Sequence, residues 1–178
     1  EAMPVKHLNL WRKYLPRAQY VNLYGPTEIT CNCTYYRIMR EFGPEEKIPA
    51  GRPFPNEKVF LLSIGRDGEV PDAEVLTEEA GFEGAETEIT KPGDIGEICV
   101  AGTALALGYY RNPEQTAKVF VQNPLNRDYP ERIYRTGDLG FYDSDGNLCF
   151  AGRRDFQIKH MGHRIELEEI ELILNGYE

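Results

Sequence analysis

The hydrophobic positions of this chain fall mostly into short runs that glycine and proline interrupt. Runs that alternate with polar residues, or that stay apolar over about four to eight residues, are typical of β-strands bounded by turns. The pattern predicts strands at residues 21–24, 31–40, 58–63, 97–101, 132–136, 140–142, 148–151 and 157–159. Residues 143–147, Asp-Ser-Asp-Gly-Asn, have the composition of a hairpin turn between two of these strands.

Helix signals occur in three other stretches. Residues 5–14 space their apolar side chains as in a short amphipathic helix, which Pro16 closes. Asn112 followed by Pro113 is typical of a helix start, because Asn caps free N–H groups and Pro suits the first turn. Residues 165–174 predict an amphipathic helix with glutamates near its start, where the helix dipole favours negative charge.

The balance of these elements predicts a mixed α+β fold. Short strands separated by glycine and proline turns are typical of a small distorted β-barrel, here with the edge of a further sheet. The pattern changes from hairpins to a strand–helix unit at residues 153–155. We therefore expect a domain boundary there, with residues 1–154 on one side and residues 155–178 on the other.

Composition and charge narrow the class of protein. With 41% apolar residues, the 178-residue chain can bury a core, and no apolar run approaches the roughly 20 residues of a membrane span. The net charge of −9 belongs to one segment, because residues 67–88 hold nine acidic side chains and no Lys or Arg. The remainder is balanced, so we expect a solvated acidic excursion and neither a nucleic acid nor a membrane as partner.

The four cysteines and three histidines lack the spacing of a zinc site. Cys31 and Cys33 lie two positions apart and would share one face of a strand. We expect all four thiols to be free, buried and reduced, as in a cytoplasmic protein. The sequence also lacks a basic-then-apolar leader that would argue for secretion.

The stretch richest in candidate chemistry is Asn22–Glu28, where a predicted strand ends in a Gly-Pro turn. Polar side chains at the end of a strand lie at a sheet edge, where α/β folds bind ligands. Thr27 can donate to a phosphate oxygen, Glu28 can ligate a hard cation such as Mg²⁺, and the Tyr24 ring can stack on a base. The alternative, that Thr27 caps a helix or turn and Tyr24 belongs to the core, fits the same residues.

Four separated motifs resemble those of the adenylate-forming enzymes. This superfamily includes the adenylation domains of nonribosomal peptide synthetases, D-alanine:carrier-protein ligases, acyl-CoA synthetases and luciferases. The motifs are Asn22–Glu28, Gly96–Tyr110, Tyr134–Leu139 and Gly152–Glu166, and residues 48–53, Ile-Pro-Ala-Gly-Arg-Pro, also look like the family. Because the motifs occur in the family's order across most of the chain, the sequence is identified as a member of this superfamily.

The resemblance implies that a carboxylate and ATP give an acyl-adenylate and pyrophosphate. The acyl group would then pass to a thiol, either phosphopantetheine on a carrier protein or CoA. Such a site must position two anionic groups and neutralise their charge. Glu28 would hold Mg²⁺ and act with Thr27 in catalysis, and Asp138 would accept from both ribose hydroxyls. By the same resemblance, the residues that bind ATP or AMP are Asn22, Tyr24, Thr27, Asp138, Phe150 and Arg153.

The resemblance also gives the two parts of the chain an identity. Residues 1–154 would be the C-terminal portion of the large adenylation domain, and residues 155–178 the hinge and the start of the small domain. Asp155 matches the hinge about which the small domain swings. Lys159 and Gly162 match the strand and loop that face the site in the thioester-forming pose. The positions that match the substrate's side-chain pocket are Leu23, Cys31 and Asn32.

The motifs favour the amino-acid-activating branch, because Pro26 precedes Thr27 and residues 154–159 look like that branch. We therefore expect an amino acid as the small-molecule substrate and a carrier protein as partner. An acyl-CoA synthetase using another carboxylic acid and a non-catalytic scaffold piece remain as alternatives. The family's phosphate loop and C-terminal catalytic lysine have no counterpart in these 178 residues. We expect a fragment that is inactive by itself, with residues 67–88 as an insertion.

Overall fold

The computed structural model describes residues 3–64, 86–154, 157–160, 163–166, 170 and 173–174. The elements before the second sheet are α1 (Val5–Tyr14), β1 (Val21–Tyr24), the 3-10 helix η1 (Thr27–Ile29), β2 (Thr34–Arg37) and β3 (Arg52–Pro53). They are followed by β4 (Glu57–Leu62), β5 (Gly96–Gly102), α2 (Pro113–Val119), β6 (Phe120–Gln122), β7 (Arg132–Tyr142), β8 (Leu148–Arg153), β9 (Gln157–His160) and β10 (His163–Glu166).

Several predicted features lie outside the described residues. They include the hinge residue Asp155, the residue Gly162 of the thioester-forming pose, and all but the last three residues of the acidic segment 67–88. Lys159 is described in its backbone only, within β9. The remaining predicted site residues all lie within residues 3–64 and 86–154, which the structure describes.

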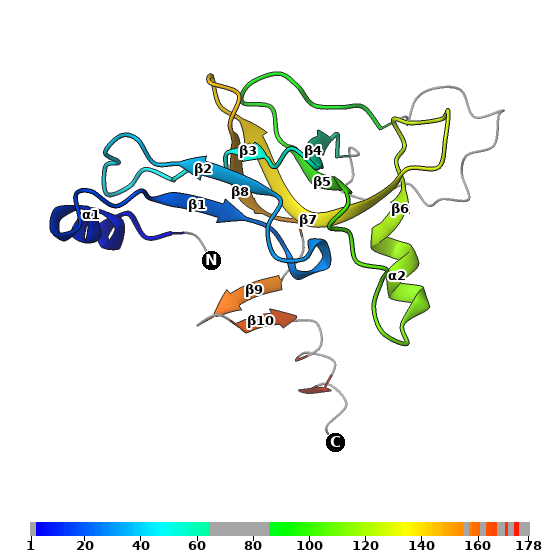
Figure 1. Cartoon of the computed structure of the whole chain (residues 1–178). Coiled ribbons are helices and arrows are strands. Elements are labelled where there is room, and N and C mark those ends of the chain that lie inside the picture. The colour runs from blue at the N-terminus through cyan, green and yellow to red at the C-terminus, as the bar shows by residue number, and fades with distance from the viewer. Residues whose placement is uncertain are drawn as a thin grey trace.

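The first unit is a three-stranded antiparallel sheet in the order β1-β2-β3, with α1 beside it (Figure 1). Helix α1 has the predicted bounds, and its amphipathic spacing buries Val5 and Leu8 against Ile38 and Phe42. Strand β2 is shorter than the predicted strand at residues 31–40. The start of that prediction is wrong because Cys31 has a φ of 89°, which an extended strand cannot contain.

The second unit is a five-stranded sheet in the order β4-β5-β7-β6, with β8 also paired to β7. The central strand β5 is buried along its length except at Gly102, because it is covered on both faces. The alternation of β4 and β5 divides their side chains between two cores. One face contributes Val59, Leu61, Ile98 and Val100, and the other contributes Phe60, Leu62, Cys99 and Ala101.

Strand β7 gives this sheet its curl (Figure 1). One edge of β7 pairs with β5, while the other pairs first with β6 and then with β8. The register shifts between Leu139 and Gly140 against β8, and between Glu97 and Cys99 against β7. Such irregularities bend strands and increase their twist. The sheet is curled into half a barrel, and the predicted mixed fold with short, distorted barrel strands is confirmed.

The two sheets meet at Gly51, which comes directly before β3 and pairs with Leu148 of β8. Each backbone N–H donates to the other's carbonyl, at 3.0 Å from Gly51 and 2.8 Å from Leu148. Gly51 has a φ of +91°, and a Cβ there would collide with the carbonyl of Tyr35. Glycine is therefore required where the first sheet crosses onto the second.

Near the C-terminus, β9 and β10 form an antiparallel hairpin in which Ile158 lies opposite Ile165. The helix predicted at residues 165–174 is wrong at its start, because Ile165 and Glu166 belong to β10. A β-branched side chain such as isoleucine suits a cross-strand pair. Residues 170, 173 and 174 are helical. Among the described residues, no helix is long and apolar enough to cross a membrane.

Candidate functional site

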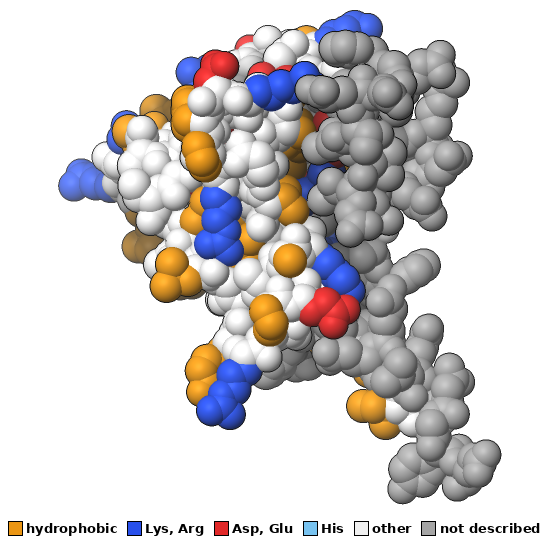
Figure 2. Space-filling view, turned by 90° about the vertical axis from the view of Figure 1, so that its right-hand side faces the viewer, with side chains coloured by type: hydrophobic (Ala, Val, Ile, Leu, Met, Phe, Trp, Pro, Cys, Tyr) orange, Lys and Arg blue, Asp and Glu red, His pale blue; other side chains and the backbone are white. Residues whose placement is uncertain are grey.

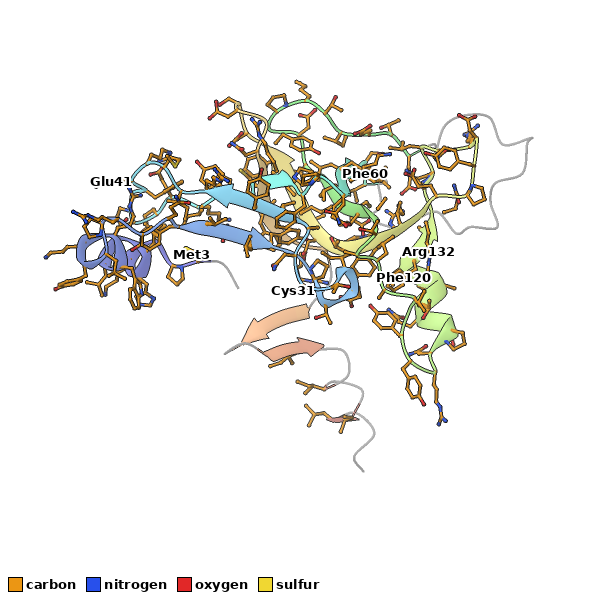
Figure 3. The ribbon with its side chains drawn as sticks, viewed as in Figure 1. Met3, Cys31, Glu41, Phe60, Phe120 and Arg132 are labelled. Atoms are coloured by element: carbon orange, nitrogen blue, oxygen red, sulfur yellow. The ribbon has the colours of Figure 1, made fainter. Side chains whose placement is uncertain are left out.

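The loop after β1 folds back onto the end of that strand. The N–H of Cys33 donates to the carbonyl of Tyr24 at 2.8 Å and closes a loop that contains η1. Gly25 permits this closure, since a Cβ there would lie 2.5 Å from the Cα of Asn32 and 2.6 Å from the carbonyl oxygen of Cys31. Figure 3 places Cys31 on this loop. The Gly-Pro turn thus carries the residues after β1 to one end of the sheet.

A kink in β7 presents Asp138. The Thr136 hydroxyl donates to the carbonyl of Ile98 at 2.8 Å and accepts from the N–H of Asp138 at 3.0 Å. Gly137 has a φ of 70° and donates its N–H to the Glu97 carboxylate at 3.2 Å. Because Thr136 and Gly137 are both tied to β5 and the N–H of Asp138 is tied to Thr136, these bonds fix the direction of the Asp138 side chain.

A buried ion pair supports this kink. The Arg135 guanidinium donates to Glu97 at 2.6 and 3.0 Å and to Glu86 at 2.6 Å. Burial alone would lower the pKa of Arg135, but the bonds to Glu97 and Glu86 raise it, so this buried residue stays charged. Arg154 lies 3.6 Å from the same Glu97 carboxylate. Glu97 therefore joins β5, the kink of β7 and the end of β8.

Three predicted nucleotide-binding residues meet at the Asp138 carboxylate. The Tyr24 hydroxyl donates to Oδ2 at 2.6 Å, and Arg153 donates to Oδ1 at 2.6 Å. Asp138 and Arg153 are cross-strand partners of β7 and β8, whereas Tyr24 comes from the end of β1. Asp138 is only 5% exposed. Burial and then the Asp138 charge raise the pKa of Tyr24, so its hydroxyl remains a donor.

Thr27 and Glu28 lie just beyond this cluster, in η1. Thr27 is exposed, but the Glu28 side chain is buried. The Tyr109 hydroxyl donates to Glu28 Oε1 at 2.6 Å, and the N–H of Ala106 donates to the Glu28 carbonyl at 2.8 Å. No individual role was predicted for Tyr109 from the sequence. Its place in the second family motif is the signal that could have singled it out.

Glu28 fits a metal ion that takes its other ligands from the phosphates of a bound nucleotide and from water. Among the residues whose side chains are described, no group of three or more His, Cys, Asp or Glu could hold a metal ion. Mg²⁺ at nucleotide sites usually takes one or two carboxylates, with phosphate oxygens and water as the other ligands. Glu28 offers one such carboxylate beside the exposed hydroxyl of Thr27.

Other predicted residues lie around the cluster. The Asn22 side chain donates to the carbonyl of Pro49 at 2.8 Å and so ties β1 to the loop before β3. Leu23 is 49% exposed on β1, and Phe150 is 37% exposed on β8. The Asn32 amide contacts the sulfur of its neighbour Cys31 at 3.3 Å. None of these contacts, within the described residues, reaches the Asp138 carboxylate.

The prediction of four buried thiols is wrong at Cys31. All four cysteines are free, as expected, and Cys33 and Cys99 are buried, but Cys149 is half-buried and Cys31 is exposed. The positive φ of Cys31 takes it out of the strand, so it does not share a strand face with Cys33. Burial raises the pKa of Cys33 to about 12.

Two shallow hollows occur in the described part of the chain, and neither includes Tyr24 or Asp138. One, of about 350 Å³, is lined by Tyr35, Tyr36, Arg37, Arg52 and Asn147. The other, of about 570 Å³, is lined by residues 107–113 and Thr116. Figure 2 views the molecule from the side of α2 and β6, where Lys and Arg side chains alternate with hydrophobic ones. We assign the candidate site to the hydrogen-bonded carboxylates of Asp138 and Glu28 and to neither hollow, because a carboxylate can bind a hydroxyl group or a metal ion.

Comparisons with known proteins show which family the chain resembles in sequence and fold. The family described as AMP-binding enzyme matches residues 1–110. The chain is 35% identical over 178 residues to tyrocidine synthase 2 of Brevibacillus parabrevis, a match covering 100% of this chain and 4% of that protein.

Two solved structures resemble the fold. PA1221, an NRPS protein containing adenylation and PCP domains, has a TM-score of 0.77 and 32% identity, covering 99% of this chain and 31% of that one. The Vibrio cholerae adenylation domain AlmE, in complex with glycyl-adenosine-5'-phosphate, has a TM-score of 0.75 and 29% identity. The match covers 98% of this chain and 29% of that one. The chain thus spans less than a third of the length of each of these three relatives. Its matched motifs and fold confirm the predicted superfamily, and the chain belongs to the AMP-binding enzyme family.

Proposed function

We propose that the protein carrying this chain joins an amino acid to ATP, giving an aminoacyl-adenylate and pyrophosphate. The aminoacyl group then passes to the phosphopantetheine thiol of a carrier protein. The observation that carries the proposal is the junction of Tyr24 and Arg153 on the Asp138 carboxylate. Residues from three separate family motifs meet at that one buried group.

In this proposal, Asp138 binds the ribose of ATP. A carboxylate has two oxygens that each accept about two hydrogen bonds, so the buried group that accepts from Tyr24 and Arg153 is of the kind that can also bind both hydroxyls of a ribose. The Tyr24 ring, held by its hydroxyl, is the stacking surface for the adenine. Asn22 and the exposed Phe150 lie on the strands that carry Tyr24 and Arg153, and we assign them to the nucleotide as well.

The Thr27–Glu28 turn would face the phosphates. The exposed Thr27 hydroxyl is available to donate to an α-phosphate oxygen, and Glu28 would hold Mg²⁺. When bound, the ion supplies positive charge that offsets the negative charge of the phosphates. Arg153 adds a fixed cation close to the ribose. These groups hold the nucleotide so that the substrate carboxylate can reach the α-phosphorus, and two anions are brought together without being left uncompensated.

The relatives and the exposed positions near the turn support our proposal of an amino acid as substrate and a carrier protein as acceptor. The structure of AlmE holds a glycyl adenylate, and PA1221 combines adenylation and PCP domains. We assign Leu23, Cys31 and Asn32 to the substrate side-chain pocket, since Leu23 and Cys31 are exposed and adjoin the turn.

The proposal divides the chain as the motifs suggest. We assign residues 1–154 to the large adenylation domain and residues 155–178 to the hinge and the start of the small domain. Asp155 would be the hinge residue, with Lys159 and Gly162 serving the thioester-forming pose. The activity belongs to the whole protein, and we propose that these 178 residues alone do not adenylate.

Exchange of radiolabelled pyrophosphate into ATP by the whole protein tests the function. A panel of single amino acids should contain at least one that drives exchange. A parallel panel of fatty and aryl acids with CoA as acceptor tests the acyl-CoA alternative. Turnover of an aryl or fatty acid with no amino acid accepted would overturn the substrate class, and no exchange with any acid would leave the scaffold alternative.

A further inference from the structure

One segment contacts the Thr27–Glu28 turn from outside. Residues 103–109, the first part of the connection from β5 to α2 and called the brace below, bring two donors to Glu28. The N–H of Ala106 donates to the Glu28 carbonyl at 2.8 Å, and the Tyr109 hydroxyl donates to the Glu28 carboxylate at 2.6 Å. The brace therefore holds both the backbone and the side chain of the proposed metal ligand.

The start of the brace is anchored to β4. The Glu57 carboxylate, 8% exposed, accepts from the N–H of Ala104 at 3.2 Å and from the Thr103 hydroxyl at 3.3 Å. The carbonyl of Ala104 in turn accepts from the Thr30 hydroxyl at 2.8 Å. The brace is thus fixed between a buried carboxylate and the end of the turn.

The far end of the brace holds Tyr109 in place. Its N–H donates to the Thr116 hydroxyl at 2.9 Å, and its ring meets Phe120 edge to face, with centroids 5.9 Å apart. Gly108 allows this approach, because a Cβ there would lie 2.5 Å from a Thr116 side-chain atom. Figure 3 shows Phe120 at the junction of α2 with the curled sheet. Tyr109 is therefore held by its backbone and its ring independently of Glu28.

We propose that Tyr109 is a positioning residue for the adenylation reaction, whose phenol fixes the orientation in which Glu28 meets the metal–nucleotide complex. The inference rests on the proposed function. A glutamate side chain has three rotatable bonds, and ordering it costs conformational entropy. A rigid donor that has already ordered the carboxylate removes this cost from ligand binding, so the metal complex binds more tightly. Loss of the phenol should thus weaken metal-dependent binding more than it lowers the maximal rate.

The test compares Tyr109→Phe with Tyr110→Phe in the whole protein. Both changes remove one phenolic oxygen and keep the ring, but Tyr110 is 86% exposed. One measurement is the dependence of pyrophosphate exchange on Mg²⁺ concentration. The other is calorimetric binding of Mn²⁺·ATP without any amino acid, which does not depend on turnover. Ordering a free glutamate side chain costs about one power of ten in affinity, so we expect both apparent constants for Tyr109→Phe to rise roughly tenfold.

Three results distinguish the possible outcomes. In support, the maximal rate of Tyr109→Phe recovers at saturating Mg²⁺, Tyr110→Phe matches wild type, and Tyr109→Phe adds no further loss of Mn²⁺·ATP affinity to Glu28→Gln. If the wild-type protein adenylates but Tyr109→Phe has the same Mg²⁺ and Mn²⁺·ATP constants as wild type, the role of Tyr109 is overturned and the proposed function is not. Wild-type protein that neither exchanges pyrophosphate nor binds Mn²⁺·ATP would overturn the proposed function, and the role of Tyr109 with it.

Discussion

Removal of the Tyr24 hydroxyl tests whether the Asp138 cluster ties distant parts of the chain together. Tyr24→Phe keeps the ring, which packs against the main core. It removes the hydroxyl that makes the 2.6 Å bond to Asp138, a residue 114 positions away. Arg153 still donates to the other carboxylate oxygen, so Asp138 is not left buried without a donor.

The magnitude follows from the charge and burial of the acceptor. A hydrogen bond to an ionised group contributes about 1.5–3 kcal/mol to stability. Asp138 is 5% exposed, so water cannot readily replace the lost donor. We therefore expect Tyr24→Phe to lower the free energy of unfolding by about 1.5–3 kcal/mol. The loss should be much smaller where Asp138 has already been replaced by asparagine, because the charge that strengthens the bond is gone.

Urea unfolding of wild type, Tyr24→Phe, Asp138→Asn and the double variant measures this coupling. The expected coupling free energy is at least about 1 kcal/mol, as for residues in one hydrogen-bond network. Tyr129→Phe is the matched control, since that ring is 61% exposed and its change should stay within about 0.5 kcal/mol. Additive effects of the two cluster variants, with Tyr24→Phe no more costly than the control, would refute the reasoning.

Three further predictions concern the same loop. Gly25→Ala should lower the free energy of unfolding by about 1–3 kcal/mol in urea melts, because a Cβ would press on the backbone of Asn32. The raised pKa of Tyr24 means that its contribution to stability is complete below about pH 10, the unfolded value, and is lost as pH rises through the folded value. Thermal melts above about pH 10 should therefore show a smaller fall for Tyr24→Phe than for wild type. In native protein an alkylating reagent should label exposed Cys31 quickly and buried Cys33 only after unfolding, as peptide mass spectrometry would show. Equal labelling of the two thiols would contradict the described loop.

Local patterns predicted the elements whose causes are local. The bounds of α1 and β1 match the predicted residues, and α2 begins with the predicted cap, where the Asn112 side chain accepts from a backbone N–H at 3.0 Å. The break predicted at residues 137–139, between strands 132–136 and 140–142, is wrong, because these residues form a kink within the single strand β7. That strand is continuous because its neighbours β5 and β8 hold it on both sides. Pairing between distant strands leaves no periodic signal in β7 itself.

In the candidate site, too, the sequence predicted individual residues but not a contact between distant segments. Motif resemblance pointed to Tyr24, Asp138 and Arg153, and the structure brings these three together. It did not reveal the contact between Tyr109 and Glu28, which lie 81 positions apart. Such a contact depends on how the brace crosses the turn, and hydrophobic periodicity carries no information about that crossing.

The most direct test of the central claim is amino-acid-dependent pyrophosphate exchange by the whole protein carrying Asp138→Asn. The change replaces a charged acceptor for the ribose by a neutral amide of similar size. Loss of hydrogen bonds worth about 3 kcal/mol predicts a fall in the exchange rate of roughly 100-fold. Asp145→Asn, the same substitution at an exposed position of the β7–β8 hairpin, should leave the rate unchanged. Near wild-type exchange by Asp138→Asn would contradict the assignment of this cluster to the nucleotide.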